Sequence, residues 1–171
     1  LKAGGNLTIT SGTSNLDCAD DTLHAGGVIK ISDGKITALS GDDGIHSDTE
    51  LTITGGTIDI QKSYEGLEGV NINIEGGDIS VVASDDGINV NDSNGLLNIT
   101  GGTTYVNARG DGLDSNGSIT MTGGTVLVDG PTSNGDGALD YDHTATITGG
   151  TLVAAGSSGM VQAITANDNK S

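Results

Sequence analysis

Residues 51–60 read LTITGGTIDI, two short runs of alternating apolar and polar residues joined by Gly55-Gly56. Alternation with a period of two is typical of β-strands, and a Gly-Gly pair is typical of a tight turn. The turn recurs at Gly76-Gly77, Gly101-Gly102, Gly123-Gly124 and Gly149-Gly150, with Asp33-Gly34 and Gly12 in the equivalent earlier positions. The chain is therefore a repeat whose unit contains two strands and the turn between them.

An acidic phrase follows the second strand of each repeat, as in SGDDGIH at residues 40–46. An acid, usually a glycine, an aliphatic residue and a polar residue return every 21 to 25 residues. The aliphatic residue marks a third short strand, and its column contains Leu23, Ile45, Leu67, Ile88, Leu113 and Leu139. Each repeat thus has three strands that face a common interior.

Aligning the turns also places like residues of the first strand in one column, which contains Leu7, Ile29, Leu51, Ile72, Leu97, Ile119 and Ala145. Stacked repeats bury such aliphatic ladders, which no single repeat could bury alone. The sequence predicts an all-β fold, a right-handed parallel β-helix (β-solenoid) of about seven coils with three short strands per coil. We expect one domain over residues 1–171, with loops at residues 91–95 and 131–134.

Composition restricts the possible partners. The net charge is −17, with 23 acids against six Lys and Arg, so nucleic acid would be repelled and cations would be attracted. No apolar run is long enough to span a bilayer. The single cysteine, Cys18, excludes an internal disulfide, and its position suits a small buried residue.

The acids of successive coils should stack in columns, with neighbours about 5 Å apart. Like charges at that distance repel by about 3 kcal/mol at an effective dielectric constant of about 20, so the columns need either full solvation or a counter-cation. Carboxylates are hard oxygen ligands, which favour Ca²⁺. The candidate ligands are Asp20, Asp21, Asp42, Asp43, Glu65, Glu68, Asp85, Asp86, Asp111, Asp114, Asp136 and Asp140.

Two alternatives to a calcium column stay open. The acids could simply solvate turns, where Asp-Gly is common. His24 and His46 fall in the column that follows the aliphatic residue, and they could bind a softer metal. Because only two histidines stand among so many carboxylates, we expect them to be surface residues.

The phrases KSYEGLEG at residues 62–69 and SDDGIN at residues 84–89 resemble a clostridial-type extracellular calcium-binding, polysaccharide-lyase-like carbohydrate-binding β-helix family. The resemblance implies secretion, calcium between the coils, and binding of cellulose or of acidic glycans such as polygalacturonate. The calcium ligands that it implies are Asp42, Asp43, Glu65, Glu68, Asp85 and Asp86. The later coils depart from the pattern, because Gly110 and Gly135 replace the first acid.

We therefore expect a non-catalytic secreted protein that binds polysaccharide with Ca²⁺. Cellulose binding exploits flat aromatic faces, and Tyr64, Tyr105 and Tyr141 do not align in one column, which favours acidic glycans. One alternative is a calcium-dependent lyase, for which Lys62 and Arg109 are the candidate bases. Another is a subunit of an extracellular filament, formed by head-to-tail stacking of uncapped β-helices.

Overall fold

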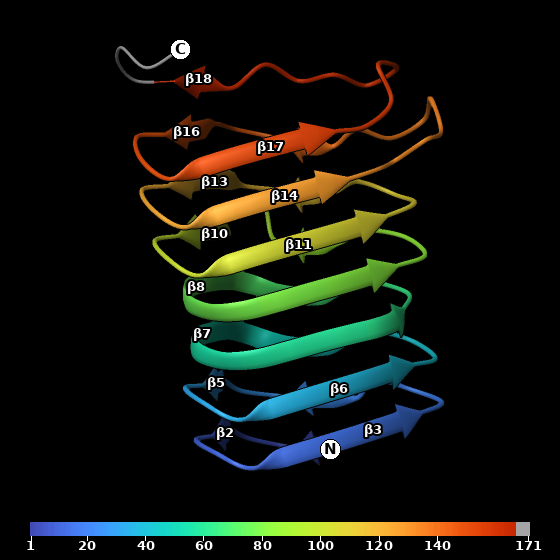
Figure 1. Cartoon of the computed structure of the whole chain (residues 1–171), viewed down its shortest axis with the longest axis vertical. Coiled ribbons are helices and arrows are strands. Elements are labelled where there is room, and N and C mark those ends of the chain that lie inside the picture. Colours follow the sequence, from blue (N-terminus) through green and yellow to red (C-terminus); the bar gives the residue numbers. More distant parts are fainter. Residues whose placement is uncertain (167–171) are drawn as a thin grey trace.

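The computed structural model describes residues 1–166, which form a parallel β-solenoid of about seven coils without any helix (Figure 1). The strands nearest the viewer run from left to right as the chain climbs, so the solenoid is right-handed. The predicted fold class is confirmed. Residues 167–171 of the expected domain lie outside the described part. Within residues 1–166, no helix is long and apolar enough to cross a membrane.

Three strand positions recur along the solenoid. The first is occupied by β2 (Leu7–Ile9), β5 (Ile29–Ile31), β10 (Leu96–Ile99), β13 (Ser118–Met121) and β16 (Ala145–Ile147). The second is occupied by β3 (Thr13–Cys18), β6 (Lys35–Ser40), β11 (Thr103–Ala108), β14 (Thr125–Asp129) and β17 (Thr151–Ala155). The third is occupied by β4 (Leu23–Ala25), β9 (Ile88–Val90), β12 (Leu113–Ser115) and β15 (Leu139–Tyr141). Two short strands, β1 (Lys2–Ala3) and β18 (Thr165–Ala166), pair with β4 and β16.

The two central coils differ from the expected three short strands. There β7 (Ile45–Ser63) and β8 (Leu67–Ala83) each run through three strand positions as one bent strand. Their parallel pairing continues around the corners with register shifts, for example between Ser47 and Glu50. We attribute this to the absence of inserted loops in these coils, which lets the corners stay paired.

The aliphatic ladders have the register that the alignment predicts. Leu51 pairs with Ile29 on one side and Ile72 on the other, and all three are fully buried. The turn between the first and the second strand of each coil needs a glycine, because its last glycine has a positive φ, such as +90° at Gly56 and +78° at Gly102. The stacked aliphatic side chains form one continuous core.

Cys18 differs from the expectation of a buried residue, because its side chain is only partly buried. It lies at the end of β3, in the first coil, and β3 pairs with β6 on one side. A strand covered by one neighbouring coil keeps more of its surface in contact with solvent.

One position interrupts the aliphatic ladder of the second strand. Thr104 pairs with Ile79 in the preceding coil and Val126 in the next, and it is 1% exposed. Its hydroxyl has no hydrogen-bond partner among the described residues. A buried hydroxyl without a partner lowers stability.

Replacing this hydroxyl with a methyl group should stabilise the protein. We expect Thr104→Val to raise the free energy of unfolding by about 1–2 kcal/mol, because the variant no longer buries an unpaired polar group. Urea denaturation of the two proteins measures the difference. Thr103→Val is the matched control, since Thr103 is exposed and should change stability by less than about 0.5 kcal/mol. A destabilised Thr104→Val variant would contradict the prediction.

Candidate functional site

The acids lie along one corner of the solenoid, between the second and the third strand of each coil. Backbone hydrogen bonds between coils define the stacking at this corner. The donor–acceptor pairs are Thr22 N to Asp43 O, Gly44 N to Glu65 O, Gly66 N to Asp86 O, Gly87 N to Asp111 O and Gly112 N to Gly137 O. The column of acids is thus present, but Gly137 takes the place expected for Asp136. Leu139 pairs with Leu113, and Asp136 lies three residues before Leu139, whereas Asp111 lies two residues before Leu113.

One oxygen of most column acids connects two coils. It accepts a hydrogen bond from the backbone N–H of the next residue in the column. The distances are 3.1 Å for Asp43 N to Asp21 Oδ1, 3.2 Å for Glu65 N to Asp43 Oδ1, 2.6 Å for Asp111 N to Asp86 Oδ1 and 2.5 Å for Gly137 N to Asp111 Oδ1. The acids therefore stabilise the corner itself, and their second oxygens are left for other partners.

The column acids, the neighbouring acids and two histidines form clusters in which one ligand atom of each residue lies within 4.8 Å of those of the others. The clusters are Asp20-Asp21-Asp42, Asp21-His24-His46, Asp43-His46-Glu68, Glu65-Asp85-Asp86 and Asp111-Asp114-Asp140. They contain every candidate ligand from the sequence except Asp136. The Asp136 carboxylate instead lies 2.5 Å from the Ser133 hydroxyl, in the loop that precedes it.

Burial and crowding raise the pKa values of several of these carboxyl groups. Desolvation, together with the neighbouring Glu68 and Glu65, raises the pKa of Asp43 to about 8. Desolvation, followed by repulsion from nearby carboxylates, raises the pKa to about 7 for Glu65 and Asp114 and to about 6 for Asp86. The corner therefore opposes full ionisation at neutral pH unless a cation balances its charge.

Asn89 gives an independent indication that a cation fits this corner. It is 9% exposed, and its amide nitrogen donates a hydrogen bond of 2.8 Å to Glu65 Oε2. Its oxygen, Oδ1, is buried without a hydrogen-bond partner. Carboxylate and amide oxygens are the ligands that Ca²⁺ prefers, and oxygens on opposite sides of a bound Ca²⁺ lie up to about 5 Å apart. The donor set and its spacing therefore fit calcium.

A groove of about 250 Å³ lies beside the acid corner, lined by Lys62, Ser63, Val82, Ala83, Ser84 and Arg109. It brings together the two basic residues that the sequence places about two coils apart. Ser84 is followed directly by Asp85, a member of the Glu65-Asp85-Asp86 cluster. The basic side chains of Lys62 and Arg109 therefore lie on the same part of the surface as the Glu65-Asp85-Asp86 cluster.

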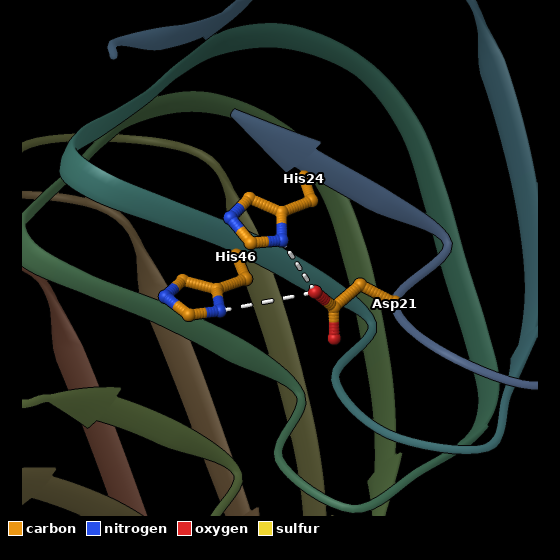
Figure 2. Close-up of side chains that lie close together, drawn as sticks. All are labelled: Asp21, His24 and His46. Atoms are coloured by element: carbon orange, nitrogen blue, oxygen red, sulfur yellow. Dashed lines mark ion pairs between the residues drawn. The ribbon is translucent and has the colours of Figure 1, made fainter. Parts of the chain in front are cut away.

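The two histidines belong to the site, which corrects the preference for surface residues over ligands of a softer metal. His24 and His46 were expected to be ordinary surface residues, but their side chains are only 18% and 21% exposed, and they lie inside two of the clusters. Figure 2 shows both rings directed toward Asp21. The signal in the sequence was their shared column with Glu68, Asn89 and Asp114, which the strand register reproduces.

Comparison with known proteins supports a carbohydrate-binding role. A family model described as "Carbohydrate-binding domain-containing protein" matches residues 1–44 and 41–169. No curated protein and no solved structure matches the chain. Because the family match covers nearly the whole sequence, this chain belongs to the carbohydrate-binding domain-containing protein family.

Proposed function

We propose that the protein binds acidic polysaccharide outside the cell and that calcium at the acid corner is required for binding. Membership of a carbohydrate-binding domain family supports a carbohydrate as the ligand. The observation that carries the finer proposal is the groove that holds Lys62 and Arg109 beside the Glu65-Asp85-Asp86 cluster. On this surface a glycan carboxylate can contact a basic side chain and a bound metal ion at the same time.

The two basic residues are available to a ligand. Both side chains are exposed, and the ion pairs among the described side chains all involve histidine rather than Lys62 or Arg109. An arginine guanidinium binds a carboxylate through two parallel hydrogen bonds, and a lysine ammonium adds a point charge. The groove is therefore suited to a uronate carboxylate.

Calcium resolves the conflict between an acidic protein and an acidic ligand. At a net charge of −17 the chain repels a polyanion at long range. Glu65, Asp85, Asp86 and the Asn89 oxygen would hold the ion. A bound calcium ion supplies positive charge and further coordination positions for sugar oxygens.

Tyr64 adds an aromatic surface at the same place. Its side chain is 48% exposed, and the neighbouring Asp85 carboxylate raises the pKa of its phenol to about 12. The ring therefore lies beside the Glu65-Asp85-Asp86 cluster. An exposed aromatic ring can pack against the apolar face of a sugar.

We infer that binding is not followed by catalysis. Family membership is compatible with a non-catalytic protein. A lyase needs a base held against the substrate in a site that excludes water. Lys62 and Arg109 are instead exposed along an open groove, which supports binding rather than proton abstraction.

A second function, end-to-end association, is favoured by one further observation. The last described coil contains a cavity of about 340 Å³, lined mostly by apolar residues that include Leu152, Val161 and Ile164. At the other end, Leu7, Ile9 and Leu16 are only partly buried. Stacking one solenoid on another would cover both surfaces.

Binding of an acidic glycan should depend on both calcium and the groove. We expect the protein to bind polygalacturonate with calcium and to lose binding in a chelator. Lys62→Gln/Arg109→Gln should weaken binding roughly tenfold or more, since charge-assisted hydrogen bonds contribute about 1.5–3 kcal/mol each. Calorimetric titration measures the affinity, and ultraviolet absorbance of the same mixtures should show no unsaturated uronate.

The matched control is Lys30→Gln/Lys35→Gln, which makes the same charge change at two exposed lysines on other strands. This control should bind as the parent protein does. Equal binding of fully methyl-esterified polygalacturonate, or binding unaffected by the chelator, would contradict the proposal.

The stability of the metal-free protein should fall as the pH rises from 5 to 8. Glu65 and Asp114 have folded pKa values of about 7 and Asp43 of about 8, whereas unfolded acids titrate near about 4. Between these values the folded state binds more protons than the unfolded state. The free energy of unfolding is therefore highest at low pH and falls as the pH rises through the folded pKa values.

Thermal melting at several pH values, with chelator and with calcium, tests this dependence. Calcium should raise the melting temperature most at pH 8, because the carboxylates are then free of protons. Glu65→Gln should make the melting temperature depend less steeply on pH in the absence of calcium, since an amide mimics the protonated acid. A melting temperature that rises with pH in the chelator would contradict the expected protonation.

End-to-end association should depend on the apolar cavity. If the solenoids stack, Val161→Asp should reduce the mass measured by light scattering, because a charge would enter the covered surface. Val153→Asp is the matched control, since Val153 is also exposed but lies in β17 outside the cavity lining. A monomeric parent protein at high concentration would rule out this second function.

A further inference from the structure

We propose that the first two coils bind one first-row transition-metal dication, of the zinc class, through His24, His46 and Asp21. This site differs in chemistry from the oxygen-only clusters farther along the corner, and it does not depend on glycan binding. Imidazole nitrogens favour zinc, cobalt, nickel and copper over calcium.

The strand register brings the two imidazoles together. His24 in β4 pairs directly with His46 in β7, and their rings stack with centroids 4.7 Å apart and an angle of 17° between the planes. The Nδ1 atoms of both rings face Asp21 Oδ2, at 2.8 Å from His24 and 3.9 Å from His46 (Figure 2). Three donor atoms from two adjacent coils therefore converge.

The Asp21 carboxylate is held in position for this role. Its other oxygen, Oδ1, accepts the backbone N–H of Asp43 at 3.1 Å. Asp21 is itself largely buried, with a side chain 7% exposed. The oxygen that faces the histidines therefore has a fixed direction set by the coil above it.

A second carboxylate sets the protonation of the rings. Asp48 Oδ1 lies 3.0 Å from His24 Nε2 and 3.5 Å from His46 Nε2. Of the two contacts of His24 with carboxylates, only the one from Nε2 to Asp48 has hydrogen-bond geometry. An ionised carboxylate only accepts hydrogen bonds, so the proton of a neutral His24 lies on Nε2 and leaves a lone pair on Nδ1. Carboxylates commonly orient metal-binding histidines from the outer nitrogen in this way.

The inner nitrogen of His24 is left without a suitable partner. Nδ1 is buried and forms no hydrogen bond, although Asp21 Oδ2 is only 2.8 Å away. In the neutral tautomer, a nitrogen lone pair and a carboxylate oxygen face each other at that distance, and a bound cation would remove this repulsion.

The spacing suits a small ion after modest side-chain movement. The three donor atoms lie within 4.8 Å of one another. Ligands on a tetrahedral zinc ion with bonds near 2.1 Å lie roughly 3.4 Å apart, so rotations that move the rings by about an ångström complete the site. Asp43 Oδ2 and Glu68 Oε2, at 3.5 Å and 3.2 Å from His46 Nδ1, are close enough to supply a fourth ligand.

Cobalt spectroscopy tests the site directly. Metal-stripped protein in a large excess of calcium should bind one equivalent of Co²⁺ near pH 7.5 with visible absorption bands, and Zn²⁺ should displace it. His24→Asn and His46→Asn should each weaken binding by roughly tenfold or more. Asparagine already occupies this column at Asn89, so both variants should fold, which the far-ultraviolet circular dichroism spectrum checks.

The control is His143→Asn, because His143 is exposed and lies outside the clusters of the described residues. It should leave Co²⁺ binding unchanged. Copper bound to the parent protein should show nitrogen coupling in its paramagnetic resonance spectrum, which an oxygen-only site would not produce. Absence of micromolar Co²⁺ binding, its loss in excess calcium, or its survival in either His24→Asn or His46→Asn would overturn the proposal.

Discussion

Stacking of identical strand positions about 4.8 Å apart is the constraint on which this structure depends. Parallel pairing in register places each residue against its equivalent in the next coil, as Leu51 lies between Ile29 and Ile72. For aliphatic residues the result is a continuous buried ladder. For acids the same geometry creates a line of like charges. Stacking in register therefore stabilises the core and causes electrostatic repulsion at the acid corner.

The corner reduces this repulsion in three ways. Backbone N–H groups of the next coil donate to one oxygen of Asp21, Asp43, Asp86 and Asp111. Burial raises the pKa values of Asp43, Glu65 and Asp114 toward neutrality, which favours retained protons. Bound cations are the third way that we propose. The backbone hydrogen bonds stabilise the fold, whereas bound cations would serve ligand binding. One set of acids can therefore have both roles.

The residue directly after the aliphatic residue of the third strand varies from coil to coil, so the available ligand atoms change along the solenoid. This position holds Lys2 in the first described strand, then His24 and His46, and then Glu68, Asn89, Asp114 and Asp140. The repeat therefore offers nitrogen donors at one end and oxygen donors along the rest. The basic groove of Lys62 and Arg109 lies next to the oxygen-rich part, where a glycan carboxylate and a calcium ion would be compatible.

The sequence by itself determined the solenoid, the register of its ladders and the corner on which the acids gather. It could do so because the repeat period states directly which residues are neighbours. Only the tertiary structure decided how side chains orient at that corner, such as the unpaired oxygen of Asn89 and the convergence of His24 and His46 on Asp21. These features depend on burial and on hydrogen bonding between coils, which periodicity does not encode.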